Sequence, residues 1–196
     1  MSQLLESIYL KDGEFRNLLY HEARMQLSTK AVFNSNQKVD LSALKNEAFP
    51  PTGLYKVRVV YDTQIRNVEF VPYEVRLVNS LKLVYDNNIN YHHKFLDRTK
   101  LEHLYSLRGK ADDILIVKNG LITDSFYANV IFKKGGNWFT PTSYLLNGTM
   151  RQSLLAEGAI KEASITVENY QHYQSCKLIN AMLGMDSSSI PIEAIY

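Results

Sequence analysis

The sequence has 196 residues, of which 45% are hydrophobic and 21% charged, and its 22 Lys and Arg residues nearly balance 20 Asp and Glu residues. This composition is typical of a globular protein with a sizeable core, and the scattered basic residues argue against nucleic-acid binding. A single cysteine, Cys176, excludes an intrachain disulfide scaffold. The start of the chain lacks a secretory-signal pattern and no apolar stretch reaches membrane-spanning length, so we expect a cytoplasmic protein without membrane or nucleic-acid partners.

The first half of the chain has the pattern of antiparallel β-structure with one or two helices. Runs of alternating or β-branched apolar residues predict strands, and a helical period of apolar positions predicts a helix. The expected elements are strands at 4–10, 15–19, 54–61 and 68–78, a helix at 21–31 and a candidate short helix at 41–47. We interpret residues 1–79 as a smaller N-terminal α/β lobe.

The second half begins after a polar, turn-like segment, and we interpret residues 80–90 as the connector between lobes. Residues 91–196 then form a larger C-terminal lobe of short strands and helices. The expected elements are a helix from Asp97 to near Gly109, strands at 114–117, 127–132 and 138–140, a helix at 149–160, a strand at 164–168, a helix at 169–175 and a strand at 177–183. The pattern predicts an α+β (mixed α/β) fold.

Two basic residues stand in positions that suggest chemistry. Lys94 follows His92 and His93, and neighbouring cationic groups or a dry pocket would supply the neutral amine that Schiff-base formation requires. On spacing alone, however, a solvated surface lysine is the more common case. Arg58 lies within an apolar strand, where an inward-facing arginine would need an anion and an outward-facing one would not. No His or Cys cluster completes a metal site.

Two further positions have both a structural and a functional interpretation. Gly148 and Thr149 stand where a loop enters a helix, which provides backbone N–H groups for a phosphate but more often marks a simple helix cap. Asp124 precedes a strand. It is either a turn carboxylate or an acid that keeps a ring nitrogen protonated, and the spacing does not decide between them.

Taken in order, the motifs resemble the class IV aminotransferases, the fold-type IV enzymes that use pyridoxal 5′-phosphate (PLP). The resemblance covers nearly the whole chain and is most specific between residues 111 and 155. Its motifs are Glu6-Ser-Ile-Tyr-Leu with Asp12-Gly13, His21-Glu-Ala-Arg24, Tyr55-Lys-Val-Arg58, His93-Lys94-Phe-Leu-Asp-Arg98, Gly120-Leu-Ile-Thr-Asp124-Ser-Phe-Tyr-Ala-Asn129, Trp138-Phe-Thr-Pro141, Leu145-Leu-Asn-Gly148-Thr149-Met-Arg151 and Ile179-Asn180-Ala181-Met182-Leu-Gly184. The last of these is similar to a stretch of aminodeoxychorismate lyases.

The resemblance implies a two-lobed architecture with a role for each candidate residue. Lys94 would carry the cofactor as an aldimine and then move protons on the substrate. Asp124 would pair with the pyridine nitrogen, at a position where the family usually carries glutamate. The resemblance also implies that the cofactor, and in most cases its phosphate, is bound by Arg58, Asn129, Gly148, Thr149, Asn180 and Ala181.

Three functions remain open at this point. The leading one is a PLP-dependent lyase that converts 4-amino-4-deoxychorismate to 4-aminobenzoate and pyruvate for folate synthesis. A class IV amino-acid aminotransferase of the branched-chain or D-amino-acid type would use the same lysine and cofactor on another small amino substrate. A non-catalytic relative that serves as a binding subunit is the third, although Lys94, Arg58 and Thr149 together argue against it. By analogy with the family we expect a homodimer.

Overall fold

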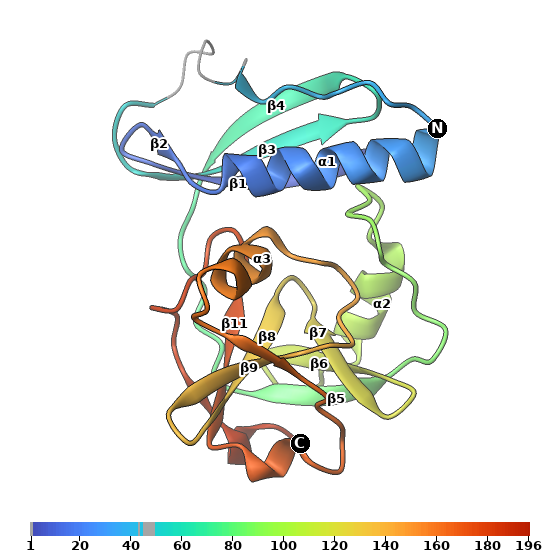
Figure 1. Ribbon diagram of the computed structural model, residues 1–196. Helices are drawn as coiled ribbons and strands as arrows, with labels where there is room; N and C mark the ends of the chain where they lie inside the picture. The colour runs from blue at the N-terminus through green and yellow to red at the C-terminus, as the bar shows by residue number, and fades with distance from the viewer. Residues whose placement is uncertain (1, 43, 45–49) are drawn as a thin grey trace. The chain divides into compact units, whose positions relative to one another are not determined.

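The computed structural model describes residues 2–42, 44 and 50–196. The chain divides into two compact units, one formed by Met1–Val75 with His93–Asp97 and the other by Arg76–His92 with Arg98–Tyr196 (Figure 1). Each unit has its own sheet and at least one helix, so the expected mixed α/β fold is confirmed. In the described part of the chain, no helix is long and apolar enough to cross a membrane.

The first unit is a four-stranded antiparallel sheet with one long helix. Its elements are β1 (Leu4–Lys11), β2 (Glu14–Phe15), α1 (Leu18–Phe33), β3 (Leu54–Tyr61) and β4 (Ile65–Pro72). The strand order is β2-β1-β3-β4. Asp12 and Gly13 both have positive φ, 48° and 85°, which is the conformation that a tight hairpin turn requires. Asp12 and Gly13 therefore close the hairpin that joins β1 and β2.

Helix α1 covers one face of this sheet (Figure 1). Alternate residues of β1 and β3 point toward it, and Ile8, Val57 and Met25 are completely buried between the two layers. The opposite face carries the residues between them in sequence, among them Ser7 and Arg58, which are directly paired across β1 and β3. The first unit thus has one apolar face closed by its own helix and one face that carries polar groups.

Some expected boundaries in the first unit were wrong. Residues 18 and 19 belong to α1 and not to a strand, because Asn17 adopts a left-handed conformation with φ of 58° and ends the strand pairing. Strand β4 begins at Ile65 and ends at Pro72, so the expected strand at 68–78 is correct only over its first residues. The candidate helix at 41–47 falls largely outside the described residues.

The second unit is built on a larger, mixed sheet. Its helices and strands are β5 (Leu81–Tyr85), α2 (Thr99–Ser106), β6 (Asp113–Lys118), β7 (Leu121–Ser125), β8 (Asn129–Lys134), β9 (Asn137–Pro141), α3 (Thr149–Ala156), β10 (Lys161–Ala163), a 3-10 helix (Tyr170–His172), β11 (Ser175–Ile179), β12 (Ile190–Pro191) and a second 3-10 helix (Ile192–Ala194). The main order is β10-β9-β8-β7-β6-β5, and β11 pairs with both β8 and β12. Helix α3 packs on β8 and β11 through Met150, Leu154, Ile131 and Ile179.

Three strands of this sheet, β5, β7 and β12, were not predicted from the sequence. β5 lies inside residues 80–90, the expected connector, and pairs in parallel with β6. No element was predicted at β7, although it contains the buried residues Ile122 to Ser125. Near the C-terminus, the expected strand at 164–168 is wrong: the strand there is β10, at 161–163, and the expected helix at 169–175 is one short 3-10 turn.

Candidate active site

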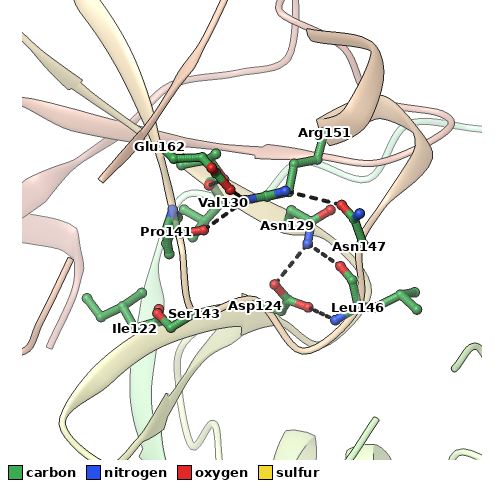
Figure 2. A network of polar contacts seen from close by, with 11 residues as sticks. Ile122, Asp124, Asn129, Val130, Pro141, Ser143, Leu146, Asn147, Arg151 and Glu162 are labelled. Atoms are coloured by element: carbon green, nitrogen blue, oxygen red, sulfur yellow. Dashed lines mark hydrogen bonds and ion pairs between the residues drawn. The ribbon is translucent and has the colours of Figure 1, made fainter. Parts of the chain in front are cut away.

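Asp124 and Asn129 meet where β7 and β8 join. They form the register pair between the two strands, and a short turn closes the hairpin, with Ser125 Oγ accepting the backbone N–H of Ala128 at 3.1 Å. The side-chain amide of Asn129 donates to Asp124 Oδ1 at 2.9 Å and to the carbonyl oxygen of Leu146 at 2.8 Å (Figure 2). The hairpin therefore fixes an amide directly against a carboxyl group.

The Asp124 carboxyl group is buried, with 6% of the residue exposed. Its other oxygen, Oδ2, accepts the backbone N–H groups of Leu145 at 3.2 Å and Leu146 at 2.9 Å. Burial raises the pKa of Asp124 to about 6, although these N–H donors, Asn129 and the charge of Arg151 act in the opposite direction. Its proton affinity is thus much higher than that of an exposed aspartate.

Gly148 places the start of α3 beside Asn129. Its φ of −65° and ψ of 145° suit any residue, so its lack of a side chain has a spatial and not a conformational cause. An ideal Cβ on Gly148 would lie only 2.0 Å from Asn129 Oδ1. Thr149, the first helical residue, is 2% exposed. The first-turn N–H groups of an α-helix lack intrahelical acceptors and carry the positive end of the helix dipole, so this end of α3 suits an anion.

Asn180 and Ala181 follow β11, whose last residue, Ile179, pairs with Asn129. The side chain of Asn180 closes its own turn, because Oδ1 accepts the backbone N–H groups of Met182 at 2.8 Å and Leu183 at 3.0 Å. Within the second unit, the structure therefore brings together six of the residues that the resemblance singled out. They are Asp124, Asn129, Gly148, Thr149, Asn180 and Ala181.

The sequence analysis assigned no role to Arg151, although this residue is almost completely buried next to these groups (Figure 2). Its guanidinium group donates to Asn147 Oδ1 at 3.1 Å and to the carbonyl oxygen of Pro141 at 3.2 Å, and it forms an ion pair with Glu162. The signal was available in the sequence, since Arg151 shares a helix face with Leu154. An arginine on an apolar face requires polar partners.

The two remaining candidates, Arg58 and Lys94, belong to the first unit. Arg58 lies on the face of the sheet opposite α1, with its side chain 36% exposed, and its Nη1 donates to Glu69 Oε2 at 3.2 Å. Glu69 is itself 45% exposed, and a pair of this kind contributes little to stability. The Arg58 guanidinium is therefore able to exchange this partner for a stronger anion.

Lys94 lies on a short extended segment that is attached to β1. Its carbonyl oxygen accepts the backbone N–H of Leu5 at 2.9 Å, and the N–H of Leu96 donates to the carbonyl oxygen of Gln3 at 2.9 Å. Leu4 and Phe95 form an antiparallel bridge between these contacts. The backbone of Lys94 is thus held by the sheet that carries Arg58.

A cluster of charged side chains is buried between β1 and α1. Glu6 accepts Arg24 Nε at 2.9 Å on Oε1 and His21 Nδ1 at 2.7 Å on Oε2. Although burial favours the neutral form, the Arg24 charge and the hydrogen bonds from His21 and Arg24 lower the pKa of Glu6 to about 2. Burial lowers the pKa of His21 and is helped by the charges of Arg24 and Lys94, whereas the hydrogen bond and the charge of Glu6 act in the opposite direction. At neutral pH, Glu6 is therefore ionised and His21 neutral.

Most of the chain matches one known protein family. The model of the family "Amino-transferase class IV" matches residues 58–189. This chain belongs to the class IV aminotransferases. The matched region contains every candidate residue from Arg58 to Ala181, whereas the Glu6, His21 and Arg24 cluster lies outside it. Among the described residues of this class IV aminotransferase, no group of three or more His, Cys, Asp and Glu side chains could hold a metal ion.

Two curated relatives cover most of the chain. A Haemophilus influenzae protein without an assigned activity is 31% identical over 94% of this class IV aminotransferase and 100% of its own length. A Schizosaccharomyces pombe protein, provisionally assigned as an aminodeoxychorismate lyase, is 28% identical over 82% of this chain and 76% of its own.

Solved structures share the fold. A Haemophilus somnus protein, provisionally assigned as a 4-amino-4-deoxychorismate lyase, has 30% identity and a TM-score of 0.86, with 94% of this chain and 98% of that chain covered. A Brucella abortus aminotransferase bound to PLP has 16% identity and a TM-score of 0.75, with 98% and 81% covered. The second likeness shows the class IV fold alone.

Proposed function

We propose that this protein is a PLP-dependent aminodeoxychorismate lyase, which converts 4-amino-4-deoxychorismate to 4-aminobenzoate and pyruvate. The observation that carries the proposal is the similarity to the Haemophilus somnus protein, which extends over nearly the full length of both chains at 30% identity. The assignment of the Schizosaccharomyces pombe relative supports the same activity. We also propose, from the family, that the active form is a homodimer, which sedimentation analysis of the purified protein would test.

The residues present fit PLP in their chemistry. The cofactor carries a phosphate, a basic ring nitrogen and an aldehyde. The start of α3 at Gly148 and the exchangeable Arg58 suit a phosphate, and the buried Asp124 suits a nitrogen that must stay protonated. Lys94 provides a primary amine on a backbone that β1 holds in place. Each chemical feature of the cofactor thus has a matching group in this chain.

PLP, when bound, withdraws electrons from bonds at the substrate atom attached to the amino group. Asp124 holds a proton at the ring nitrogen, and Asn129 keeps the carboxyl group oriented through its 2.9 Å hydrogen bond. Because Asp124 Oδ1 has one donor and Oδ2 has two, Oδ1 retains the capacity to accept the ring N–H.

Lys94 is the proton-transfer group of the proposed reaction. As a neutral amine it removes the proton from the substrate ring carbon that bears the amino nitrogen. It then assists departure of the three-carbon group as pyruvate, and the aromatic ring formed in 4-aminobenzoate provides the driving force. As the family resemblance implies, Arg58 and the start of α3 would bind the cofactor phosphate and so help to orient the substrate for proton transfer.

A class IV amino-acid aminotransferase is the second candidate, because the matching family model is named for that activity. Product analysis separates the two. The lyase predicts stoichiometric 4-aminobenzoate and pyruvate from 4-amino-4-deoxychorismate without any added 2-oxo acid. The aminotransferase predicts turnover only when a 2-oxo acid is supplied as amino acceptor.

The control for this experiment is Lys94→Ala, which should abolish product formation in either case. If wild-type protein with added PLP forms no product from 4-amino-4-deoxychorismate and transfers no amino group, the enzymatic proposal fails and a binding subunit becomes the better interpretation. Product formation by Lys94→Ala at the wild-type rate would exclude Lys94 as the proton-transfer group.

A further inference from the structure

Arg151 contacts the segment that connects β9 to α3 at several points along its length. We call residues 142–148 the connecting segment. The guanidinium group donates to the carbonyl oxygen of Pro141, immediately before the segment, and to Asn147 Oδ1 near its end (Figure 2). It also lies 4.2 Å from the ring centre of Tyr144. Its side chain is 3% exposed. Arg151 therefore joins the two ends of the connecting segment.

The connecting segment in turn provides hydrogen-bond partners to Asp124 and to Asn129. Leu145 and Leu146 donate both backbone N–H groups that Oδ2 accepts. The carbonyl oxygen of Leu146 accepts the second N–H of the Asn129 amide, which orients this amide toward Oδ1. Ser143 Oγ fastens the segment to β7 by donating to the carbonyl oxygen of Ile122 at 2.6 Å. A change in the path of the segment would thus remove donors from Asp124.

The charge of Arg151 also acts on Asp124. From β8 and the connecting segment, the groups that face the carboxyl group are neutral N–H donors, whereas α3 contributes the Arg151 cation, whose field favours the ionised form. Glu162, on β10, pairs with Arg151 and is 48% exposed, so water screens its negative charge more than it screens the buried cation. Burial opposes the ionisation of Asp124. The charge of Arg151 and the N–H groups of the connecting segment that Arg151 holds in place act against this effect.

We propose that Arg151 is a positioning residue that holds the connecting segment against Asp124 and thereby keeps this carboxyl group ionised. The assignment of Asp124 to a cofactor nitrogen rests on the proposed function, but the link between Arg151 and Asp124 does not. An ionised Asp124 can stabilise a proton on a ring nitrogen, whereas a neutral one cannot. Arg151 would in this way influence the cofactor ring through Asp124.

The test is a carbon-13 NMR titration of the cofactor-free protein with labelled aspartate side chains, in which loss of a signal in Asp124→Asn assigns the Asp124 resonance. Arg151→Met removes both the positive charge and the guanidinium N–H donors. We expect the titration midpoint of Asp124 in this variant to lie about one pH unit or more above that of the wild-type protein. Arg151→Lys retains the charge but cannot bond Pro141 and Asn147 together, so its midpoint should lie in between. An unchanged midpoint in folded Arg151→Met overturns the proposal, and Arg151→Lys decides in the same way if the first variant does not fold.

Glu162→Gln is the matched control, because it removes the ion pair and leaves the contacts of Arg151 with the connecting segment. The titration midpoint of Asp124 should not rise in this variant. A rise as large as in Arg151→Met would overturn the proposal, because it would show that any disturbance of the contacts around Arg151 has the same effect. The visible absorbance of wild-type protein with PLP separates this inference from the proposed function. If no band forms but the midpoints shift as expected, the proposed function fails and this inference stands. If the band forms and the midpoints do not shift, this inference fails alone.

Discussion

Asn129 Oδ1 occupies the space in which a Cβ on residue 148 would lie, at 2.0 Å from the ideal Cβ position. The same Asn129 side chain donates to Asp124 and to the carbonyl oxygen of Leu146. One asparagine therefore couples the start of α3 to the buried carboxyl group. Because the backbone of Gly148 is in an extended conformation open to any residue, the requirement for glycine is set by Asn129 alone.

Gly148→Ala should therefore displace Asn129 and break its two hydrogen bonds. We expect the free energy of unfolding to fall by about 2–4 kcal/mol, which combines overpacking with the lost hydrogen bonds. In an Asn129→Ala background the same substitution should cost less than about 1 kcal/mol, because the clash is gone. Urea denaturation of the four proteins measures this cycle. Equal costs in both backgrounds would contradict the steric account.

Glu6→Gln should destabilise the first unit because it leaves the Arg24 charge in a buried site without its carboxylate. We expect a loss of about 3 kcal/mol in the free energy of unfolding. Glu69→Gln is the matched control: it removes an acid from the same sheet that is 45% exposed, and it should cost less than about 1 kcal/mol. Chemical denaturation at neutral pH compares the two. Similar losses would show that the buried cluster has no special weight.

The buried carboxyl groups make the free energy of unfolding depend on pH in two opposite ways. Burial raises the pKa of both Asp113 and Asp124 to about 6, so these two groups bind more protons in the folded protein than in the unfolded chain between about pH 4 and 6. These groups make stability fall as the pH rises through that range, by about 1 kcal/mol per pH unit for each group. Glu6, with its pKa lowered to about 2, makes stability fall as the pH drops below about 4.5.

Asp113→Asn isolates one of these contributions, since Asp113 lies at the start of β6, is not one of the candidate cofactor residues, and its Oδ2 has no hydrogen-bond partner among the described residues. Unfolding by urea at a series of pH values should show the wild-type protein losing stability relative to this variant between pH 4 and 6, by up to about 3 kcal/mol. A difference independent of pH would mean that Asp113 ionises normally.

Arg58→Met tests the proposed phosphate contact. Loss of a charge-assisted hydrogen bond should weaken PLP binding about tenfold or more, while the free energy of unfolding changes by less than about 1 kcal/mol because the pair with Glu69 is exposed. Pyridoxal, which lacks the phosphate, is the matched ligand and should bind wild type and variant equally. A parallel loss of affinity for both ligands would place the effect of Arg58 elsewhere on the cofactor.

Local sequence patterns predicted the elements whose signals are local. The Asp12-Gly13 hairpin, α1 and β3 follow from turn chemistry and periodicity, and β3 was predicted with its observed bounds. β5 was missed because its five residues include Lys82 and stand between polar segments. A strand of this kind forms through parallel pairing with β6, which is distant in sequence. Tertiary pairing, not local preference, determines that strand.

The same distinction applies to the candidate site. Motif order singled out Asp124, Asn129 and Gly148, and the structure brings them into contact. The position of Arg151 on the same face of α3 as Leu154 indicates that it needs polar partners, but it does not identify them, because Pro141 and Glu162 lie on strands that folding brings to α3. Likewise, Glu6 gives no sign in the sequence that Arg24 and His21 will enclose it.

The central claim is that Lys94 carries PLP in this protein. The most direct measurement is borohydride reduction of the PLP-loaded protein, followed by digestion and mass spectrometry of the peptides. The account predicts a pyridoxyl phosphate adduct on Lys94, together with loss of the visible absorbance band, and no adduct in Lys94→Ala. An adduct confined to another lysine, or no adduct at any lysine of the wild-type protein, would contradict it.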